Sequence, residues 1–376
     1  MIIGIDGRAA KWYRGTGIGT YTYELINSLN KIDKINKYYL FMPEKNKGNI
    51  NLNKNFNIVN TFQNTVSNFW EEINSANDIY NTNMNLYHIP QNGIGIPLRK
   101  KCPFIITLHD IIPYRMPETV SSKYLKIFTE EMPKIISSCD GIITVSDFSK
   151  KDIIKSFNFP EDKIFVTHLA SENIYMPLSK RICKYFIEKN YSIHGNFILY
   201  VGSFSPRKNI TGLIESFSKF ISKTKKDIKL VIAGKQGISY DNYKKRSIEL
   251  KVESNVIFPG FIPIEHMPYL YNAADLFVYP SFYEGFGLPL LEAMSCGVPV
   301  ITSDATSIPE VVEDAAVKIN PYDIDDMSNA IYEVYTNPDL RKNLISKGLL
   351  RAMNFSWDET ARKTLDSYKQ IAKCFS

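Results

Sequence analysis

Strand-length apolar runs alternate with helix-like stretches along almost the whole chain, and this alternation limits the fold more than any other feature. Alternating strands and helices imply parallel sheets whose faces are covered by helices. A chain of 376 residues exceeds what a single hydrophobic core comfortably organises, and it suits two such domains. The predicted class is therefore α/β, with two doubly wound, Rossmann-like domains.

The apolar runs form two sets, and residues 169–177 between them are predicted to be a linker. The first set predicts strands at residues 2–6, 38–42, 86–89, 104–108, 141–145 and 163–167, with helices including 19–29 and 130–137. The second predicts strands at residues 197–201, 229–233, 256–259, 276–279 and 300–302, with helices including 210–220, 240–251, 267–272 and 290–295. We place the N-terminal domain at residues 1–173 and the C-terminal domain at 174–357, with a helix around 180–189 in the latter.

Composition and charge exclude several classes of protein. The net charge of +6 permits attraction to anionic substrates or an anionic membrane surface, but it is too weak to indicate nucleic-acid binding. The five cysteines are scattered and form no C-x-x-C pair, which favours buried thiols of a reducing compartment. The chain opens directly as a strand and has no run long enough to cross a bilayer, so we expect a cytoplasmic protein.

Residues 279–292 combine the end of a strand, a glycine loop and the start of a helix. Gly285 and Gly287 allow a sharp turn and the close approach of a ligand. Pro289 suits the first helical position, and the N–H groups of that first turn favour an anion. Glu284 and Glu292 bracket the loop. Such an anion site beside two carboxylates suits a ligand that is part phosphate and part polyol, such as a nucleotide sugar.

The two glutamates, with seven residues between them and Gly-Phe-Gly-Leu-Pro at 285–289, resemble the signature of retaining family-4 glycosyltransferases of the GT-B fold. Residues 272–275 and 293–300 agree with the same pattern. The resemblance implies two domains facing across a cleft, with residues 358–376 carrying a final helix back onto the first domain. It also implies that Glu284 binds hydroxyls of the donor sugar, while we expect Glu292 to hold the ribose hydroxyls.

A basic pair follows the first strand of the second domain. Arg207 and Lys208 lie within residues 202–209, just before a predicted helix. Arg offers a forked contact to phosphate oxygens and Lys a mobile point charge. Together they could neutralise a diphosphate leaving group as its charge develops. A solvated basic turn is the plainer interpretation, and the resemblance to the family's paired basic residues favours the functional one.

The glycine loop at residues 15–19 follows the first strand and opens a helix. The resemblance implies that Gly17 and Gly19 face the donor phosphates and the acceptor. Many strand–helix turns carry glycines for structural reasons alone. A dinucleotide site would need G-x-G-x-x-G and an acid after the second strand, for which Glu44 is a candidate. Residues 7–14 make the turn too long for such a loop, which disfavours an NAD-binding oxidoreductase.

His109 and Asp110 end the strand at residues 104–108 and are predicted at the edge of the cleft. His109 occupies the position of the family's active-site histidine, where it would hydrogen-bond a donor hydroxyl or stabilise charge near the anomeric carbon. Asp110 would orient it or contact an acceptor. A lone histidine after a strand is more often a structural residue.

Three other acidic or loop segments receive weaker predictions. Glu310 at a helix start suits the helix dipole at least as well as a substrate role, and residues 302–304 are placed at the pocket wall. Asp323 and Asp325 spell D-x-D, which we interpret as a helix cap rather than a metal–diphosphate motif. The resemblance implies that backbone groups around Phe261 recognise the base, and that no metal is needed.

The expected function is a retaining, metal-independent glycosyl transfer without a cofactor beyond the nucleotide sugar. Residues 108–113 resemble bacterial mannosyl- and rhamnosyl-type members of the family, and GDP-mannose is the expected donor. The expected acceptor is a glycan or lipid-linked glycan of a cell-surface polysaccharide. Basic residues 99–101 and 150–151 offer a peripheral contact with an anionic membrane. An inactive glycosyltransferase-like subunit that binds a partner enzyme is the alternative, and a GT-B epimerase or phosphorylase is less favoured. The expected donor-binding residues are Gly17, Gly19, Gly202, Phe261, Phe286, Gly287, Leu288 and Glu292.

Overall fold

The computed structural model describes residues 1–43, 51–60, 79, 82–235, 237 and 239–374. The chain divides into two compact units. Unit 1 comprises Met1–Leu169 and Ser356–Ser376, and unit 2 comprises Ala170–Phe355. The sequence-based boundaries fall at 173/174 and 357/358. Glu44, the acid considered for a dinucleotide site, lies outside the described residues.

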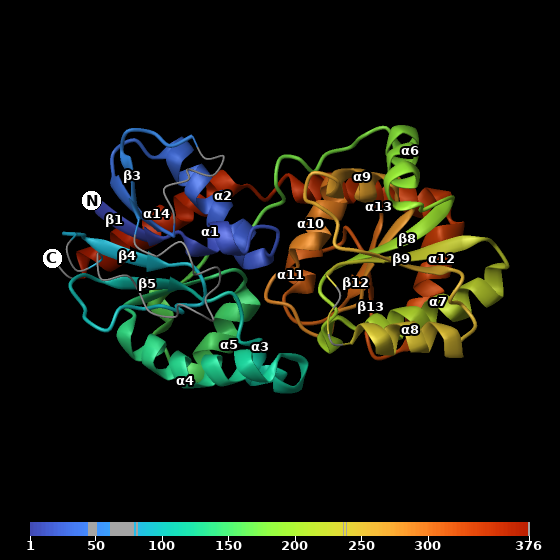
Figure 1. The fold of residues 1–376 in the computed structure, drawn as a ribbon, viewed down its shortest axis with the longest axis horizontal. Coiled ribbons are helices and arrows are strands. Elements are labelled where there is room, and N and C mark those ends of the chain that lie inside the picture. The colour runs from blue at the N-terminus through green and yellow to red at the C-terminus, as the bar shows by residue number, and fades with distance from the viewer. Residues whose placement is uncertain (44–50, 61–78, 80–81, 236, 238, 375–376) are drawn as a thin grey trace. The chain divides into compact units, whose positions relative to one another are not determined.

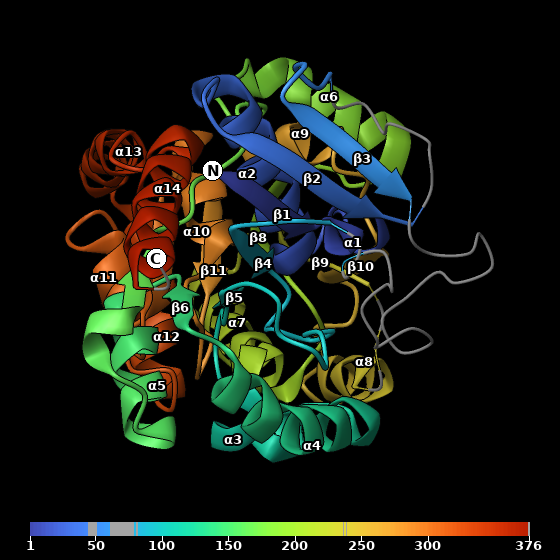
Figure 2. The ribbon, with the colours of Figure 1, turned by 90° about the vertical axis from the view of Figure 1, so that its left-hand side faces the viewer.

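Unit 1 is built on a seven-stranded parallel sheet in the order β3-β2-β1-β4-β5-β6-β7. Figure 2 shows β1, β2 and β3 side by side. The central strands are buried throughout, because a parallel sheet covered on both faces needs apolar side chains on both. The strands are β1 (Ile2–Asp6), β2 (Lys37–Met42), β3 (Phe56–Asn60), β4 (Leu86–Ile89), β5 (Phe104–Thr107), β6 (Gly141–Thr144) and β7 (Ile164–Val166).

The helices of unit 1 begin with side-chain caps in four cases, at Thr16, Ser121, Ser146 and Ser356. Each oxygen accepts a hydrogen bond from a backbone N–H of the first turn, which satisfies a donor that the helix itself leaves unpaired. The helices are α1 (Arg8–Trp12), α2 (Gly17–Ile32), α3 (Ile112–Arg115), α4 (Ser122–Ser138), α5 (Asp147–Phe157) and α14 (Trp357–Lys373).

The C-terminal helix α14 packs within unit 1, beside α2 and next to β6 and β7 (Figure 1). Its Tyr368 hydroxyl lies 2.7 Å from Nδ1 of His88, whose Nε2 lies 2.8 Å from Oγ1 of Thr107. Tyr21 of α2 completes this buried chain at 2.8 Å from the same threonine oxygen. Burial lowers the pKa of His88 to about 3, so the ring is neutral and joins α14 to the sheet by hydrogen bonds rather than charge.

Unit 2 is built on a six-stranded parallel sheet in the order β10-β9-β8-β11-β12-β13. Its strands are β8 (Asn196–Val201), β9 (Ile228–Ala233), β10 (Val256–Gly260), β11 (Leu276–Tyr279), β12 (Val300–Ser303) and β13 (Val317–Ile319). Its helices are α6 (Lys180–Tyr191), α7 (Ile210–Thr224), α8 (Tyr240–Glu249), α9 (Met267–Ala273), α10 (Leu288–Ser295), α11 (Ile308–Val312), α12 (Ile324–Thr336) and α13 (Pro338–Ala352).

The predicted α/β class, with two doubly wound parallel sheets, is confirmed. Two edge strands, β3 and β13, were not predicted, nor were the helices α1, α5 and α13. Residues 7–14 are not an extended turn, because most of them form α1. In the part of the chain that the structure describes, no helix combines the length and the apolar character that a membrane crossing requires.

Candidate active site

Two loops of unit 2 meet where the order of the strands reverses, between β8 and β11. The loop after β8 contains a 3₁₀ turn, Pro206–Lys208, and the loop after β11 contains Glu284. The N–H of Phe282 donates to the carbonyl oxygen of Arg207 at 2.8 Å, so the two loops are joined by their backbones. In doubly wound sheets this switch point, at the carboxyl ends of the strands, is where ligands bind.

Arg207, Lys208 and Glu284 form an ion triad at this junction, in which Lys208 and Glu284 are buried and Arg207 is half-buried. Lys208 Nζ lies 2.5 Å from Oε1 of Glu284, and Arg207 NH1 lies 3.0 Å from Oε2. Arg207 also donates to the carbonyl oxygen of Tyr283 at 2.8 Å. Each carboxylate oxygen therefore has its own cation, and the triad carries one positive charge in excess.

The environment of Glu284 holds it as an anion. Burial alone would raise its pKa, but the charges of Arg207 and Lys208 outweigh burial and lower the pKa to about 2. Its N–H donates to Oγ1 of Thr306 at 3.0 Å, and its carbonyl oxygen accepts from Oγ of Ser307 at 2.9 Å. These two contacts fix the backbone from the loop before α11, so the carboxylate is positioned as well as charged.

Tyr279, at the end of β11, was not predicted as a site residue. Its hydroxyl accepts a hydrogen bond from Lys208 Nζ at 2.5 Å, and the same nitrogen lies 4.8 Å from the centre of its ring. Tyr200 of β8 stacks on Tyr279 with 6.1 Å between ring centres. The lysine is thus held between a carboxylate and an aromatic wall, which suits a cation that must not swing into solvent.

The sequence predicted Pro289 at the first position of a helix, but helix α10 begins one residue earlier, at Leu288. Gly287 adopts a φ of +98°, and a Cβ there would lie 2.9 Å from Cδ1 of Leu290, so glycine is required. Leu288 is the first helical residue and Pro289 the second. Pro289 lacks an N–H, and the N–H of Leu290 donates to the carbonyl oxygen of Gly287. The backbone N–H groups of Gly287 and Leu288 are therefore the candidates for binding an anion at this helix start. The side chains of Phe286 and Leu288 are buried.

Glu292 lies in α10 and differs sharply from Glu284. Its Oε2 accepts a hydrogen bond from the Tyr271 hydroxyl at 2.6 Å, and the Tyr175 hydroxyl also lowers the pKa of this carboxyl group. Burial raises the pKa of Glu292 to about 7, with a further contribution from Glu172, while the tyrosine hydroxyls oppose the shift. The residue keeps partial exposure, so an external hydroxyl can still reach it.

The remaining predicted donor residues of unit 2 flank this junction along the same sheet edge. Gly202 follows β8, and a Cβ on Gly234, after the neighbouring β9, would lie 1.9 Å from its carbonyl oxygen. Phe261 follows β10 and is 65% exposed. Gly260 before it adopts a φ of +80°. An exposed ring beside a glycine turn is compatible with stacking on a base, a role that stays a prediction.

His109 of unit 1 is held as a neutral imidazole. Burial lowers its pKa to about 4, and its Nε2 lies 3.0 Å from the carbonyl oxygen of Pro90. A carbonyl oxygen only accepts, so Nε2 carries the proton and Nδ1 is an acceptor. The ring stands edge-on to Tyr21, with 4.8 Å between centres. A neutral acceptor fits a hydrogen bond from a sugar hydroxyl better than the stabilisation of charge.

The other predicted residues of unit 1 have local structural roles. Asp110 Oδ1 accepts from the N–H of Ile112 at 3.1 Å, which starts α3. A Cβ on Gly19 would lie 1.8 Å from the carbonyl oxygen of Tyr13, so the crossing of α1 over α2 explains this glycine. Gly17 has open space where its Cβ would point. Of the two glycines, Gly17 is the better candidate for a ligand contact.

A second polar cluster lies at the switch point of unit 1, between β1 and β4, and sequence reasoning missed it. Arg8 and Asp6 form an ion pair of 2.7 Å with almost no exposure. Gln91 Nε2 donates to Oδ2 of Asp6 at 2.6 Å. The signal was available, because Asp6 ends the first strand of the domain. The cluster places polar groups at the switch point, where ligands bind in doubly wound sheets.

Asp323 caps α12, as the sequence predicted for the D-x-D segment. Its Oδ1 accepts from the N–H groups of Asp325 and Asp326 at 2.9 and 3.0 Å. This geometry is that of a helix N-cap and occupies the carboxylate that a metal would need. Glu310 lies in the first turn of α11.

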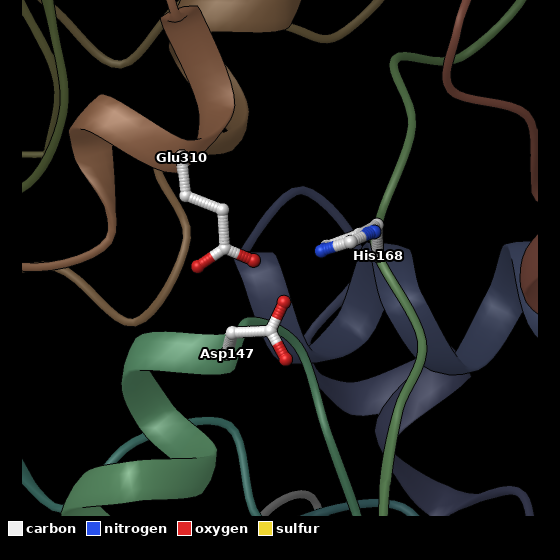
Figure 3. A group of neighbouring side chains, drawn as sticks. All are labelled: Asp147, His168 and Glu310. Atoms are coloured by element: carbon white, nitrogen blue, oxygen red, sulfur yellow. The ribbon is translucent and has the colours of Figure 1, made fainter.

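Figure 3 shows Glu310 with Asp147, which begins α5, and His168, which follows β7. These are residue types that can bind a metal ion. Asp147 and His168 belong to unit 1 and Glu310 to unit 2, and the relative positions of the units are not determined. We therefore build no joint site from them.

The structure thus joins three predicted residues across two loops of unit 2, Arg207, Lys208 and Glu284, and Glu292 follows in α10. His109, Asp110, Gly17 and Gly19 lie in unit 1 and are described with that unit alone. Each set occupies the carboxyl ends of its own parallel sheet.

Comparison with known proteins assigns each of the two units to a glycosyltransferase family. Residues 15–170 match the family described as Glycosyltransferase Family 4, and residues 186–351 match Glycosyl transferases group 1. The chain is 37% identical over 286 residues to O-antigen chain mannosyltransferase B of Escherichia coli, covering 76% of this chain and 74% of that protein. It is 27% identical over 273 residues to the serotype-specific mannosyltransferase WbdA of Escherichia coli, a match that covers 71% of this chain but 33% of WbdA.

Among solved structures, sucrose-phosphate synthase from Thermosynechococcus elongatus aligns over 98% of both chains with a TM-score of 0.75 and 19% identity. This likeness extends over both units and shows a shared fold. Together with the family matches and the 37% identical relative, it shows that the chain belongs to the family-4 glycosyltransferases of the GT-B fold.

Proposed function

We propose that this glycosyltransferase moves a hexose, mannose being expected, from a nucleotide diphosphate to a glycan or lipid-linked glycan of a cell-surface polysaccharide. The observation that carries the proposal is the ion triad of Arg207, Lys208 and Glu284 at the switch point of unit 2. Two fixed cations suit a diphosphate, and the carboxylate beside them suits the hydroxyls of the attached sugar. Mannose and the polysaccharide are supported by the names of the two Escherichia coli relatives.

In this proposal the two cations act on the leaving group. As the bond between the sugar and the diphosphate breaks, negative charge grows on the phosphate oxygens, and Arg207 and Lys208 stabilise it. Because both cations are already fixed by Glu284, Tyr279 and Tyr283, little reorganisation is needed at that moment. Preorganised charge of this kind also supports transfer without a bound metal ion.

We propose retention of configuration from the resemblance to the retaining family, and the state of Glu284 disfavours one of the two routes to it, the double displacement. A double displacement needs a nucleophile with a free lone pair, yet both oxygens of this carboxylate are bound to cations and its pKa is lowered to about 2. Such a group attacks an anomeric carbon poorly. Front-face attack, in which the leaving phosphate helps to deprotonate the acceptor, is therefore the route we propose.

The cytoplasmic location is supported by the five cysteines, all of which are free thiols. A peripheral membrane contact is supported by Leu98, which is 93% exposed beside the basic residues 99–101. An apolar side chain flanked by cations is the pattern that binds an anionic interface. Lys100 forms an ion pair, with its Nζ 2.6 Å from Oδ1 of Asp140, so its charge is partly neutralised within the protein.

The proposal is tested by thermal shift and by donor hydrolysis with GDP-mannose, UDP-glucose, UDP-N-acetylglucosamine and dTDP-rhamnose, with a chelator present. We expect GDP-mannose to stabilise the protein and to be cleaved slowly to GDP, with transfer once a mannose-containing acceptor is added. The anomeric configuration of the product, read by nuclear magnetic resonance, tests retention. If no nucleotide stabilises the protein, the alternative of an inactive partner subunit takes its place.

A further inference from the structure

Two tyrosines from different segments converge on Glu292. Tyr271 comes from α9 and donates its hydroxyl to Oε2 of the glutamate at 2.6 Å. Tyr175 comes from the chain segment before α6, and its hydroxyl interacts with the same carboxyl group and lowers the pKa of Glu292. The two rings pack edge to face, with 5.7 Å between centres and an angle of 81°. Both tyrosines are buried, so their hydroxyls are directed by packing rather than by solvent.

The segment that carries Tyr175 is tied down on both sides of it. Ser171 Oγ lies 2.7 Å from Oγ of Ser295 at the end of α10. Asn272, next to Tyr271, accepts from the N–H of Leu178 at 2.7 Å and donates to the carbonyl oxygen of Met176 at 3.0 Å. The segment is therefore bound to the same two helices that carry Tyr271 and Glu292. This bonding holds the Tyr175 hydroxyl in one place.

A carboxylate offers about four lone-pair sites for hydrogen bonds. The Tyr271 hydroxyl uses one of them, the Tyr175 hydroxyl interacts with the same group, and at least two sites remain for an incoming ligand. Two acceptors in one fixed plane match a pair of neighbouring hydroxyls, as in the 2′- and 3′-hydroxyls of a ribose. A freely rotating carboxylate would lose conformational entropy on forming the same bonds.

We propose that Tyr175 and Tyr271 are positioning residues that fix the carboxylate of Glu292 for recognition of the ribose of the nucleotide donor. This inference rests on the proposed function, since it presumes a nucleotide on unit 2. The tyrosines act through the glutamate and touch no reacting atom. Their removal therefore weakens nucleotide binding and ribose selectivity, and leaves the turnover of saturated enzyme largely unchanged.

The test uses Tyr175→Phe and Tyr271→Phe, which remove only the hydroxyls, with GDP, UDP and their 2′-deoxy forms as probes in calorimetry on the full chain. Wild-type protein is expected to prefer the ribonucleotide about tenfold, and each variant to bind it about tenfold more weakly. In both variants the preference for ribose over deoxyribose falls towards one. Tyr191→Phe is the matched control, because it removes a hydroxyl bond of 2.6 Å to His266 elsewhere in unit 2.

Glu292→Gln provides the second arm. If the hydroxyls act through the carboxylate, adding Tyr271→Phe to this variant weakens binding no further. A shifted pH profile gives an independent signature, because Tyr175 and Tyr271 lower the pKa of Glu292 whereas Glu172 raises it. Cys296 is the other titratable group that faces this carboxyl. The pH midpoint of nucleotide binding is therefore expected to rise in both tyrosine variants.

The outcomes separate the inference from the function beneath it. One outcome is that wild-type protein binds a nucleotide and both variants bind it with the same affinity and the same ribose preference. This result overturns the positioning role and leaves the proposed function intact. Equal weakening of ribonucleotide and deoxyribonucleotide overturns it too, since that result indicates a structural role. If wild-type protein binds none of the four nucleotides, the proposed function fails and the inference falls with it.

Discussion

The two glutamates that bracket the glycine loop sit in opposite electrostatic environments. Glu284, before α10, is paired with two cations, and its pKa is lowered to about 2. Glu292, inside α10, is hydrogen-bonded by neutral tyrosine hydroxyls, and burial raises its pKa to about 7. One short motif thus produces a permanent anion and a group that titrates near neutrality.

The contrast indicates a division of labour. An anion between Arg207 and Lys208 keeps two cations in place before a diphosphate arrives, and it needs charge to do so. Glu292, among tyrosines, has no neighbouring cation to neutralise, and it recognises neutral hydroxyls by the geometry of its hydrogen bonds. The two positions should therefore respond differently to the same chemical change, the replacement of Glu by Gln.

The largest effect is expected from Glu284→Gln. Removal of the anion takes the carboxylate partner from buried Lys208 and half-buried Arg207, which costs about 3–5 kcal/mol of unfolding free energy. The efficiency kcat/KM should fall by about 10³ as the cations lose their geometry. Glu292→Gln, the matched change in the same motif, should alter the unfolding free energy by less than about 1 kcal/mol at about pH 5, where the Glu292 side chain is itself neutral. Urea unfolding and steady-state kinetics measure both quantities.

Equal losses of stability in the two glutamine variants would contradict the contrast. The result would show that the ion triad is not what distinguishes Glu284 from Glu292. The variant Glu284→Asp keeps the charge on a shorter side chain, and it should recover most of the stability but little of the activity.

Lys208→Ala separates turnover from binding on the Glu284 side. Lys208 is buried and bonded to both Glu284 and Tyr279, whereas Arg207 keeps partial exposure. We expect Lys208→Ala to lower kcat by about 10³ and Arg207→Ala by about 10², with donor KM changing less. Lys208→Arg is the control for charge without the correct shape. A raised KM at unchanged kcat would instead make these residues donor-binding groups only.

The contributions of the two carboxyl groups to stability should also change in different pH ranges. The pKa of Glu284 is lowered by folding, so its stabilising contribution is present above about pH 4.5 and is lost as the pH falls towards about 2. The pKa of Glu292 is raised by folding, so its contribution is present below about pH 4.5 and is lost as the pH rises through about 7.

In wild-type protein the unfolding free energy should therefore decrease between about pH 5 and pH 8, and Glu292→Gln should remove this decrease. Nucleotide affinity should rise over the same range, because the ionised carboxylate accepts hydroxyl bonds more strongly. Unfolding and binding titrations of the two proteins check both trends. An identical pH dependence in the glutamine variant would place the titrating group elsewhere.

The fold was predictable where strands are buried on both faces. Residues 104–106 and 276–279 are continuous apolar runs, and they lie in the central strands β5 and β11. The missed strands β3 and β13 lie at sheet edges. β3 carries asparagine at its second and last positions, and β13 has three residues, so neither shows an apolar run. Edge strands are half-exposed, which weakens the pattern that reveals central ones.

The site was predictable where its residues stand in motifs that directly follow predicted strands, as Arg207, Lys208 and Glu284 do. Glu284 and Glu292 were found because one loop and helix carry both. Tyr175 and Tyr271 reach Glu292 through the packing of α9 and the preceding segment on α10, and no spacing in the sequence encodes that contact. Tyr279 could have been predicted from the sequence, because it ends a predicted strand directly before the glycine loop.

The smallest effect is expected from a carboxylate outside both environments. Asp323 is exposed and caps α12 through two backbone N–H groups, so Asp323→Ala should cost about 1 kcal/mol of unfolding free energy. Asp323→Asn, which can still cap, should restore it. Neither variant should change donor KM or the response to Mg²⁺ and chelator, because the aspartate only caps a helix. A loss of Mg²⁺-dependent activity would instead make D-x-D a metal site, and the Arg207–Lys208 pair would no longer account for the stabilisation of the diphosphate.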